Sequence, residues 1–445
     1  MFMGTMSVDD KNHLTIGGCD TVALAHRYGT PLYVLDEHFL RQKARTYRTI
    51  FNDLIPGSKV LYAGKALLNS AVCRIMAEEG LGLDVVSGGE LYTALTADFP
   101  REQIYFHGNN KSSAELKMAL ERGIGRIVVD NIWELKTLGE LAARRGVNVS
   151  ILIRLTPGVE PNTHSYVRTG QFDSKFGLPI NADTTMDAIR QAVDMPGIDL
   201  KGFHCHIGSQ IMELDAYQKT VRLMIEFLAR LKRGLGLTVE ELDLGGGLGI
   251  TYLPDEKSPS LLDYAQAISS ALTTSCQKHR LAMPQIAVEP GRSIVGEAGI
   301  TLYTIGAVKE VPGVRKYVAV DGGMADNPRV AMYGAKYTGC LANRVLDDAE
   351  ELVTIAGKCC ESGDILIRDI SLPTVRTGDI LAVYATGAYN YSMASNYNRL
   401  PRPAMVLVWQ GKSDIIVERE TYDDLVRLDR IPQRLTEAKA AVVKG

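Results

Sequence analysis

The sequence predicts an α/β protein: a (β/α)8 barrel of TIM type with a second domain made mostly of β-strands, a β-barrel or sandwich. Short apolar runs recur eight times between residues 59 and 290, and most are followed by helical periodicity. Eight such units over about 250 residues are what a parallel barrel requires. After about residue 299, strand-like runs follow one another without comparable helices. We therefore expect the barrel at 36–298, and the β-rich domain at 1–35 and 299–445.

The predicted elements follow in chain order. The eight barrel strands are expected at 59–64, 81–86, 103–108, 126–130, 150–155, 200–206, 241–246 and 285–290. Helical periodicity is clearest at 69–80, 112–123, 132–146 and 216–231. The strand-like runs of the second domain are 301–311, 316–323, 379–389 and 404–420. The polar segment 159–177 is too long for an ordinary barrel connection, so it is predicted to be an active-site or interface loop.

The composition of the chain argues against nucleic acid and an anionic membrane as binding partners. The chain has 445 residues, 46% of them hydrophobic, and a net charge of −3, which offers no basic field for nucleic acid or an anionic membrane. Neither a signal peptide nor a membrane-spanning run is evident, so we expect a cytoplasmic protein. The seven cysteines lack CxxC spacing, which argues against a disulfide framework or a zinc site. The adjacent Cys359 and Cys360 are the candidates for a reactive thiol.

Polar residues stand where the predicted strands end. In such barrels the catalytic groups come from the C-terminal ends of the strands. The residues at these ends are Lys65, Asp84, Ser87, His107, Arg154, His204, His206, the glycines of 245–249, and Glu289 to Arg292. The polar chemistry is therefore predicted to gather at one rim.

Lys65 interrupts the apolar stretch 60–69 at the end of the first strand. One interpretation is that its methylenes are buried while the ammonium reaches solvent. The other is that a lysine held at the end of a buried strand has a depressed pKa and acts as an amine nucleophile toward a carbonyl. The rest of the rim decides between them.

Glycines follow the last two strands. Gly245 to Gly247 and Gly249 allow the backbone to approach an anion, and Gly291 with Arg292 stands at the second edge of the same cup. Loops after strands seven and eight are the usual phosphate site of this barrel. The alternatives are a glycine-rich turn without a ligand, or a dinucleotide site, whose GxGxxG spacing is not matched.

Two histidines, His204 and His206, project from one face of the sixth strand. With His107 and Asp84 they suggest a metal-dependent hydrolase as an alternative function. A metal site, however, gives no role to the predicted phosphate cup. A ligand whose flat ring stacks on one imidazole and whose phosphate lies in the cup would explain both features. A lysine amine, a phosphate cup, an imidazole and the carboxylate of Glu289 together describe a pocket for pyridoxal phosphate.

Several motifs carry a resemblance to a known family. They are YAGKA (62–66), HGNNKS (107–112), THSYVRTG (163–170), DSKFG (173–177), HCHIGSQ (204–210), LDLGGGLGI (242–250), EPGRSIV (289–295), CCESGD (359–364) and ATGAYNYSMASNYN (385–398). In order and over nearly the whole chain, from about Pro31 to Arg427, they resemble the diaminopimelate decarboxylases. This family belongs to the alanine racemase-like, fold type III pyridoxal phosphate enzymes.

The resemblance implies a role for each matching residue. Lys65 is the Schiff-base lysine of pyridoxal 5'-phosphate, His206 stacks on the ring, and Glu289 pairs with the pyridine nitrogen. The other implied cofactor contacts are Asp84, Ser209, Gly246, Gly247, Gly291, Arg292 and Tyr389. The implied substrate contacts are Arg292, Arg329, Tyr333, Glu361 and Tyr389, of which Arg292, Arg329 and Tyr333 match the positions that hold the distal carboxylate. No metal is implied.

The resemblance also implies a homodimer with shared active sites. Cys360 and Glu361 would enter the partner's pocket, and Cys360 would return a proton to the substrate carbon. Two departures from the family pattern, Val330 after Arg329 and Lys358 before the cysteine pair, are expected to loosen the loops that carry these residues.

The implied reaction is decarboxylation of meso-2,6-diaminopimelate to L-lysine, in lysine biosynthesis. An ornithine, lysine or arginine decarboxylase is the alternative, but such substrates end in a cation, which Arg292 and Arg329 disfavour. The ornithine enzymes also show Cys-Asp where this chain has Cys360 and Glu361. A non-catalytic homologue is a further alternative, weakened because the lysine, the glycines and Glu289 are all present.

Overall fold

The computed structural model describes residues 2–160, 170 and 173–435, and its centre is a closed barrel of eight parallel strands. Strand β13 pairs with β5, which closes the barrel. The eight strands are β5 (Lys59–Ala63), β6 (Gly82–Val85), β7 (Ile104–Phe106), β8 (Arg126–Val129), β9 (Val149–Thr156), β11 (Ile198–Cys205), β12 (Glu241–Asp243) and β13 (Gln285–Val288). The predicted TIM-type barrel and its strands are confirmed. The short β10 (Leu178–Pro179) adds to the edge of β9.

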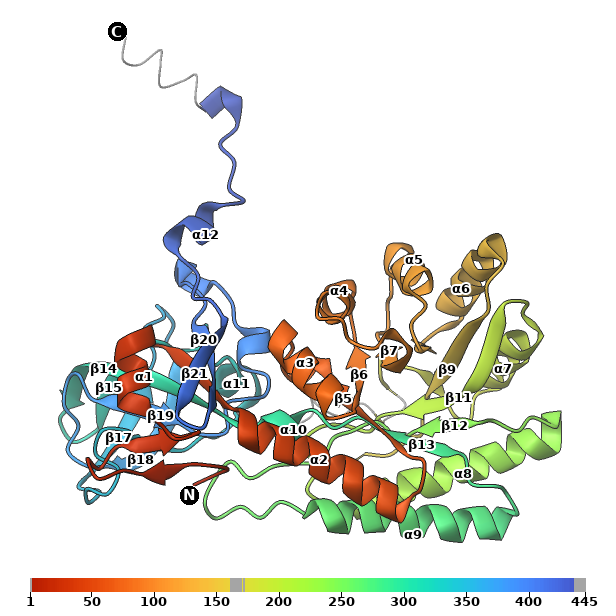
Figure 1. Cartoon of the computed structure of the whole chain (residues 1–445), viewed down its shortest axis with the longest axis horizontal. Helices are drawn as coiled ribbons and strands as arrows, with labels where there is room; N and C mark the ends of the chain where they lie inside the picture. Colours follow the sequence, from red (N-terminus) through yellow and green to blue (C-terminus); the bar gives the residue numbers. More distant parts are fainter. Residues whose placement is uncertain (1, 161–169, 171–172, 436–445) are drawn as a thin grey trace.

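Helices cover the outside of the barrel (Figure 1). They are α2 (Glu37–Leu54), α3 (Ser70–Glu78), α4 (Gly88–Thr96), α5 (Ser113–Arg122), α6 (Ile132–Arg145), α7 (Asp183–Asp194), α8 (Asp215–Leu235), α9 (Leu261–His279) and the single turn α10 (Arg292–Val295). Local chemistry explains the ends of α5. Ser112 and Glu115 form a capping box at its start, and Gly123 ends it in the left-handed region, at φ 60°. The four predicted helices are confirmed, although α8 runs on to Leu235.

A second sheet lies beside the barrel, on the left of Figure 1. Its strands are β4 (Leu32–Asp36), β14 (Gly299–Val311), β15 (Arg315–Val320), β16 (Gly339–Leu341), β17 (Glu351–Ala356), β18 (Ile365–Leu372), β19 (Ile380–Val383), β20 (Ala404–Trp409) and β21 (Lys412–Val417). The N-terminal β4 pairs antiparallel with β14 and parallel with β20. This confirms a sheet-rich second part, while the predicted domain boundaries stay a prediction.

Smaller elements complete the sheet-rich part. They are the sheet of β1 (Ser7–Val8), β2 (Leu14–Ile16) and β3 (Cys19–Asp20), and the helices α1 (Thr21–Tyr28), α11 (Arg329–Tyr333) and α12 (Tyr422–Val426). Asp20 starts α1 by accepting hydrogen bonds from the backbone N–H groups of Val22 and Ala23.

Apolar packing forms one core around the barrel and another in the sheet-rich part. The barrel interior is filled by a separate cluster of buried side chains: Leu61, Tyr105, Val128, Leu152 and Ala287. The barrel is therefore a packed support rather than a channel, and the site must lie at its end.

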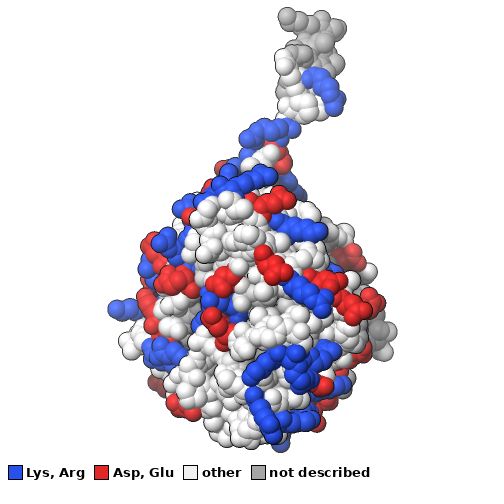
Figure 2. Space-filling view, turned by 90° about the vertical axis from the view of Figure 1, so that its right-hand side faces the viewer, with Lys and Arg blue, Asp and Glu red and all other residues white. Residues whose placement is uncertain are grey.

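The surface carries charges of both signs. Figure 2 shows acidic and basic side chains interspersed over the face seen from the right of Figure 1, with one group of basic side chains near its lower edge. In the described part of the chain, no helix has both the length and the apolar character needed to cross a bilayer.

Candidate active site

A cavity of about 820 Å³ opens at the C-terminal ends of the barrel strands. Its wall combines residues of the barrel loops with residues of the sheet-rich part around α11. Ten of the predicted site residues line it: Lys65, His206, Ser209, Gly247, Glu289, Gly291, Arg292, Arg329, Tyr333 and Tyr389. The structure therefore brings together residues that are more than 300 positions apart in the sequence, as Lys65 and Tyr389 show.

Four predicted residues lie elsewhere. Asp84 is fully buried behind Lys65, and the N–H of Gly246 donates to Nδ1 of His206 at 3.2 Å. Cys360 and Glu361 are exposed and do not line the cavity of their own chain. Their predicted entry into the pocket of a partner subunit stays a prediction.

Lys65 stands on a short turn directly after β5, at Gly64–Ala66. The carboxylate of the fully buried Asp84 lies 3.5 Å from its Nζ. Burial is the largest single influence and lowers the pKa of Lys65, but Asp84, Tyr389 and Glu289 together outweigh it and raise the pKa above its ordinary value. The prediction of a depressed pKa is therefore wrong for this state, because the sequence did not show that an acid lies beside the amine.

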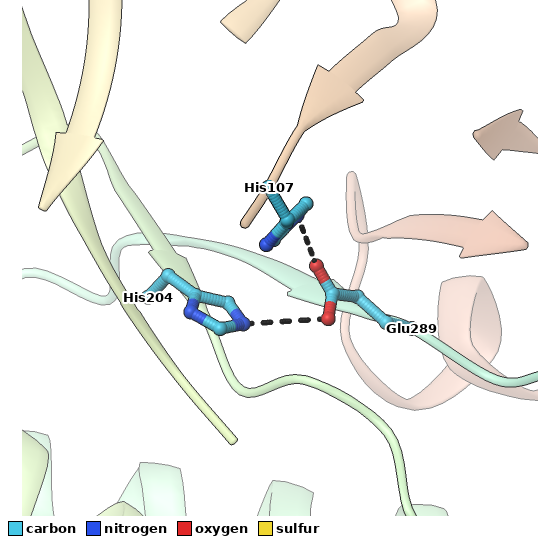
Figure 3. A group of neighbouring side chains, drawn as sticks. All are labelled: His107, His204 and Glu289. Carbon is cyan, nitrogen blue, oxygen red and sulfur yellow. Dashed lines mark hydrogen bonds and ion pairs between the residues drawn. The ribbon is translucent and has the colours of Figure 1, made fainter. Parts of the chain in front are cut away.

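Glu289 lies between two imidazoles (Figure 3). Nε2 of His107 is 2.7 Å from Oε1, and Nε2 of His204 is 3.3 Å from Oε2. Burial lowers the pKa of His204 to about 3, so that imidazole is neutral at neutral pH. Burial opposes the ionised form of Glu289, but the two imidazoles prevail and hold its pKa well below the ordinary value. The cavity floor therefore carries a carboxylate.

The possible metal ligands that the structure brings together differ from the set predicted from the sequence. Possible ligand atoms of His107, His204 and Glu289 lie within 4.8 Å of one another. The set predicted from the sequence, with His206 and Asp84, is not the one assembled. His206 instead accepts a hydrogen bond from Gly246 in the glycine loop, and burial lowers its pKa well below the ordinary value. A neutral imidazole beside a glycine loop suits stacking on a flat ring.

The glycine run packs directly against the loop after β13. Gly245 and Gly247 have φ values of 68° and 113°, which favour glycine. A Cβ on Gly246 would collide with the backbone carbonyl of Glu289. Gly247 and Gly291 both line the cavity. Bare backbone is thus presented to the cavity from two adjacent loops, as an anion site requires.

Two arginines, Arg292 and Arg329, form another part of the wall. Arg292 and Arg329 are each only 6% exposed, and both donate to the hydroxyl of Tyr252, at 2.6 and 2.9 Å. Arg292 also donates to Oγ of Ser209 at 2.9 Å. Among the described residues, neither guanidinium forms an ion pair with a carboxylate. Since buried charges are normally paired, these two cations are prepared for an anionic ligand.

Some residues of the site were not predicted from the sequence. Tyr252 lines the cavity, and Tyr337 accepts from Arg329 at 2.7 Å. The only signal for Tyr252 was its position just after the glycine run. Much of the predicted loop 159–177, including most of THSYVRTG, lies outside the described residues, but Lys175 and Phe176 line the cavity.

Comparison with known proteins identifies the family. The family model described as "Pyridoxal-dependent decarboxylase, pyridoxal binding domain" matches residues 39–296. The diaminopimelate decarboxylase of Bacillus subtilis is 50% identical over 430 residues, which cover 96% of this chain and 98% of the relative. The chain belongs to the diaminopimelate decarboxylase family. The resemblance predicted from the motifs is thereby confirmed.

Solved structures of the family support the same assignment. The diaminopimelate decarboxylase of M. jannaschii superposes with a TM-score of 0.91 at 39% identity, covering 97% of this chain and 99% of the other. A second structure of that protein, in complex with L-lysine, gives a TM-score of 0.89 at 38% identity, with the same coverage of both chains. The arrangement of barrel and sheet described above is therefore that of the family.

One buried ion pair supports the wall of the cavity in this family member. Nζ of Lys111, which is 2% exposed, lies 2.8 Å from Oε1 of Glu134 and donates to the carbonyls of Gly108 and Val128. Gly108 lines the cavity beside His107. The pair therefore fixes the loop that carries one of the two imidazoles on Glu289.

We expect Lys111→Met to lower the free energy of unfolding by about 3 to 5 kcal/mol, because it leaves the carboxylate of Glu134 buried without a cation. Urea unfolding followed by circular dichroism measures the loss. The double variant Lys111→Met with Glu134→Gln removes the unpaired charge and should recover part of the stability. A single variant as stable as the wild type would show that the pair contributes nothing.

Proposed function

We propose that this chain decarboxylates meso-2,6-diaminopimelate to L-lysine and carbon dioxide with pyridoxal 5'-phosphate. One observation carries the choice of substrate: Arg292 and Arg329 line the cavity, are buried, and form no ion pair with a carboxylate of the described residues. A substrate with a carboxylate at each end provides an anion for this part of the wall while its other end reacts. L-lysine is the ligand named for a solved relative.

The residues of the cavity fit pyridoxal phosphate. The amine of Lys65 is proposed to bind the aldehyde, and His206 to stack on the ring. The carboxylate of Glu289 is buried and stays ionised between its two imidazoles, so it is proposed to accept from a protonated pyridine nitrogen. The backbone of Gly246, Gly247 and Gly291, with Ser209 and Arg292, is proposed to hold the phosphate. Asp84 and Tyr389 complete the proposed cofactor contacts.

When bound, pyridoxal phosphate withdraws the electron pair left on the substrate carbon as carbon dioxide departs. The chain's own part is to hold that carbon in place. Arg329, Arg292 and Tyr333 bind the distal carboxylate, and Glu289 keeps the cofactor nitrogen protonated because it remains ionised. Sγ of Cys360, from a second copy of the chain, returns a proton to the carbon.

The second candidate is a decarboxylase of basic amino acids. A lysine/ornithine decarboxylase of Vibrio vulnificus has a TM-score of 0.73 with this chain, but at 23% identity this shows the fold alone. Its substrates end in a cation, which two adjacent guanidiniums repel. The two arginines therefore argue against this candidate.

Release of carbon dioxide tests the proposal directly. Protein supplied with pyridoxal phosphate is incubated with meso-diaminopimelate, ornithine, lysine or arginine, with and without a chelator. We expect release from meso-diaminopimelate alone, unaffected by the chelator. Preference for a basic amino acid would overturn the substrate, and loss of activity with the chelator would favour a role for a metal at His107, His204 and Glu289.

We propose that the active site is shared between two copies, since Cys360 and Glu361 are exposed and lie outside the cavity of their own chain. Lys65→Ala and Cys360→Ala then damage different halves of each composite site. Mixing the two inactive variants, unfolding them together and refolding them should restore up to about a quarter of the wild-type activity. Activity no greater than that of either variant refolded alone would indicate a self-contained site in each subunit.

A further inference from the structure

Tyr252 occupies an unusual electrostatic position in the cavity wall. Its hydroxyl accepts a hydrogen bond from Arg292 at 2.6 Å and another from Arg329 at 2.9 Å. The residue is 7% exposed, and it is one of those that line the cavity. Its ring packs edge-on against Tyr337, with the centroids 5.3 Å apart, so the hydroxyl is held in place between the two cations.

The two hydrogen bonds to this hydroxyl leave its own proton without an acceptor among the described residues. A phenol has one proton to donate and accepts through its oxygen, whereas a guanidinium can only donate. Both contacts from the arginines therefore use the oxygen of Tyr252 as acceptor. In the part of the chain that the structure describes, the proton of Tyr252 has no acceptor. Since Tyr252 lines the cavity, this proton is available to a ligand bound there.

The neighbouring Tyr337 provides the contrast. Its hydroxyl also accepts from Arg329, at 2.7 Å, but its own proton goes to Oδ1 of Asn390 at 3.2 Å. Tyr337 is buried and does not line the cavity. Its hydrogen bonds are thus completed inside the protein, and the hydroxyl braces Arg329 without a donor left for a ligand.

We propose that Tyr252 is a specificity-determining residue whose hydroxyl donates to the distal carboxylate of the substrate. This rests on the proposed function. Two adjacent cations polarise the O–H bond, so the best acceptor is an anion, and an ammonium group offers no lone pair to accept it. The carboxylate held by Arg329 thus receives a third donor, whereas a substrate ending in an amine leaves the proton of Tyr252 unpaired.

Two anions are available in such a site, the distal carboxylate and the phosphate of the cofactor. Arg292 donates to Oγ of Ser209, on the proposed phosphate side, through its other terminal nitrogen, Nη2. Tyr252 accepts from Arg292 too, but it also shares Arg329 with Tyr337, on the side of the sheet-rich part. We therefore assign its proton to the carboxylate, and the test separates the two anions.

L-lysine and cadaverine make a matched pair of probes. The product L-lysine keeps the distal carboxylate, and cadaverine is the same diamine without it. Binding of each is measured by calorimetry to the protein loaded with pyridoxal phosphate, for the wild type, Tyr252→Phe and Tyr337→Phe. We expect Tyr252→Phe to weaken the binding of L-lysine about tenfold or more. The affinities for cadaverine and for pyridoxal phosphate should stay unchanged. Tyr337→Phe should weaken the binding of L-lysine clearly less than Tyr252→Phe does.

Kinetics provide a second measurement. Because Tyr252 contacts the end of the substrate remote from the reacting carbon, Tyr252→Phe should raise KM for meso-diaminopimelate about tenfold and leave kcat near that of the wild type. Equal losses of L-lysine binding in the two variants would overturn the proposal in favour of bracing. A loss of pyridoxal phosphate affinity with unchanged L-lysine binding would assign the proton to the phosphate. Absence of carbon dioxide release by the wild type would instead reject the proposed function.

Discussion

Replacing Lys65 by alanine is expected to remove the yellow absorbance of pyridoxal phosphate joined to a lysine, together with nearly all release of carbon dioxide. The amine lies at the floor of the cavity, 3.5 Å from the carboxylate of Asp84, on the rim that also carries Glu289. Without it the cofactor has no covalent attachment and the substrate amine has no lysine to displace. The visible spectrum of the purified protein and the rate of carbon dioxide release measure the two losses.

Another lysine of the cavity provides the control. Lys336 lines the cavity from the segment after α11, on the side of the sheet-rich part. Lys336→Ala removes an ammonium from the same cavity and should keep the yellow absorbance. If Lys65→Ala retains both the absorbance and the activity, or if Lys336→Ala loses the absorbance instead, the attachment has been assigned to the wrong lysine.

The barrel was predictable because each of its strands is a short apolar run that ends in polar or glycine residues. In β5 the run 59–63 is followed at once by Gly64 and Lys65, and β13 is followed by Glu289 and Gly291. Parallel strands place all such ends at one rim, so the order of the runs also predicts which side chains meet. The two-residue β10 has too few residues to form a recognisable pattern.

The charges of the site were less predictable, because they depend on distances between side chains. The sequence placed Lys65 and Asp84 on the same rim, but only the 3.5 Å separation shows that the acid raises the pKa of the amine. The same holds for the imidazoles on Glu289, of which His107 directly follows β7 and His204 lies in β11. Tyr337 is separated from Tyr252 by 85 residues, and no local pattern links them to Arg329.

Arg329→Leu is expected to lower kcat/KM for meso-diaminopimelate by about two orders of magnitude or more. The guanidinium is buried, lines the cavity and has no carboxylate partner among the described residues, so the substrate's distal carboxylate is its proposed counterion. Removing one partner of a buried charged pair costs about 2 to 5 kcal/mol, much of it from the charge left unpaired. Leucine also removes the arginine donor to the hydroxyl of Tyr337 and one of the two arginine donors to the hydroxyl of Tyr252. Steady-state kinetics with meso-diaminopimelate and with lysine measure the effect. When lysine is the substrate, its single carboxylate is the one that reacts, so no carboxylate is left at the distal end.

The competing explanation is that Arg329 only braces α11 through its two tyrosines. Arg344→Leu is the matched control, because Arg344 pairs with Asp379 in the sheet-rich part and does not line the cavity. A stability defect in this part of the molecule should lower the thermal midpoint in both variants, whereas loss of the substrate contact should lower kcat/KM in Arg329→Leu alone. Pyridoxal phosphate affinity should stay unchanged in both variants, because the side-chain hydrogen bonds of Arg329 among the described residues go to Tyr252 and Tyr337. An unchanged kcat/KM for meso-diaminopimelate would remove the argument for a substrate with two carboxylates, and a basic amino acid would then become the better candidate.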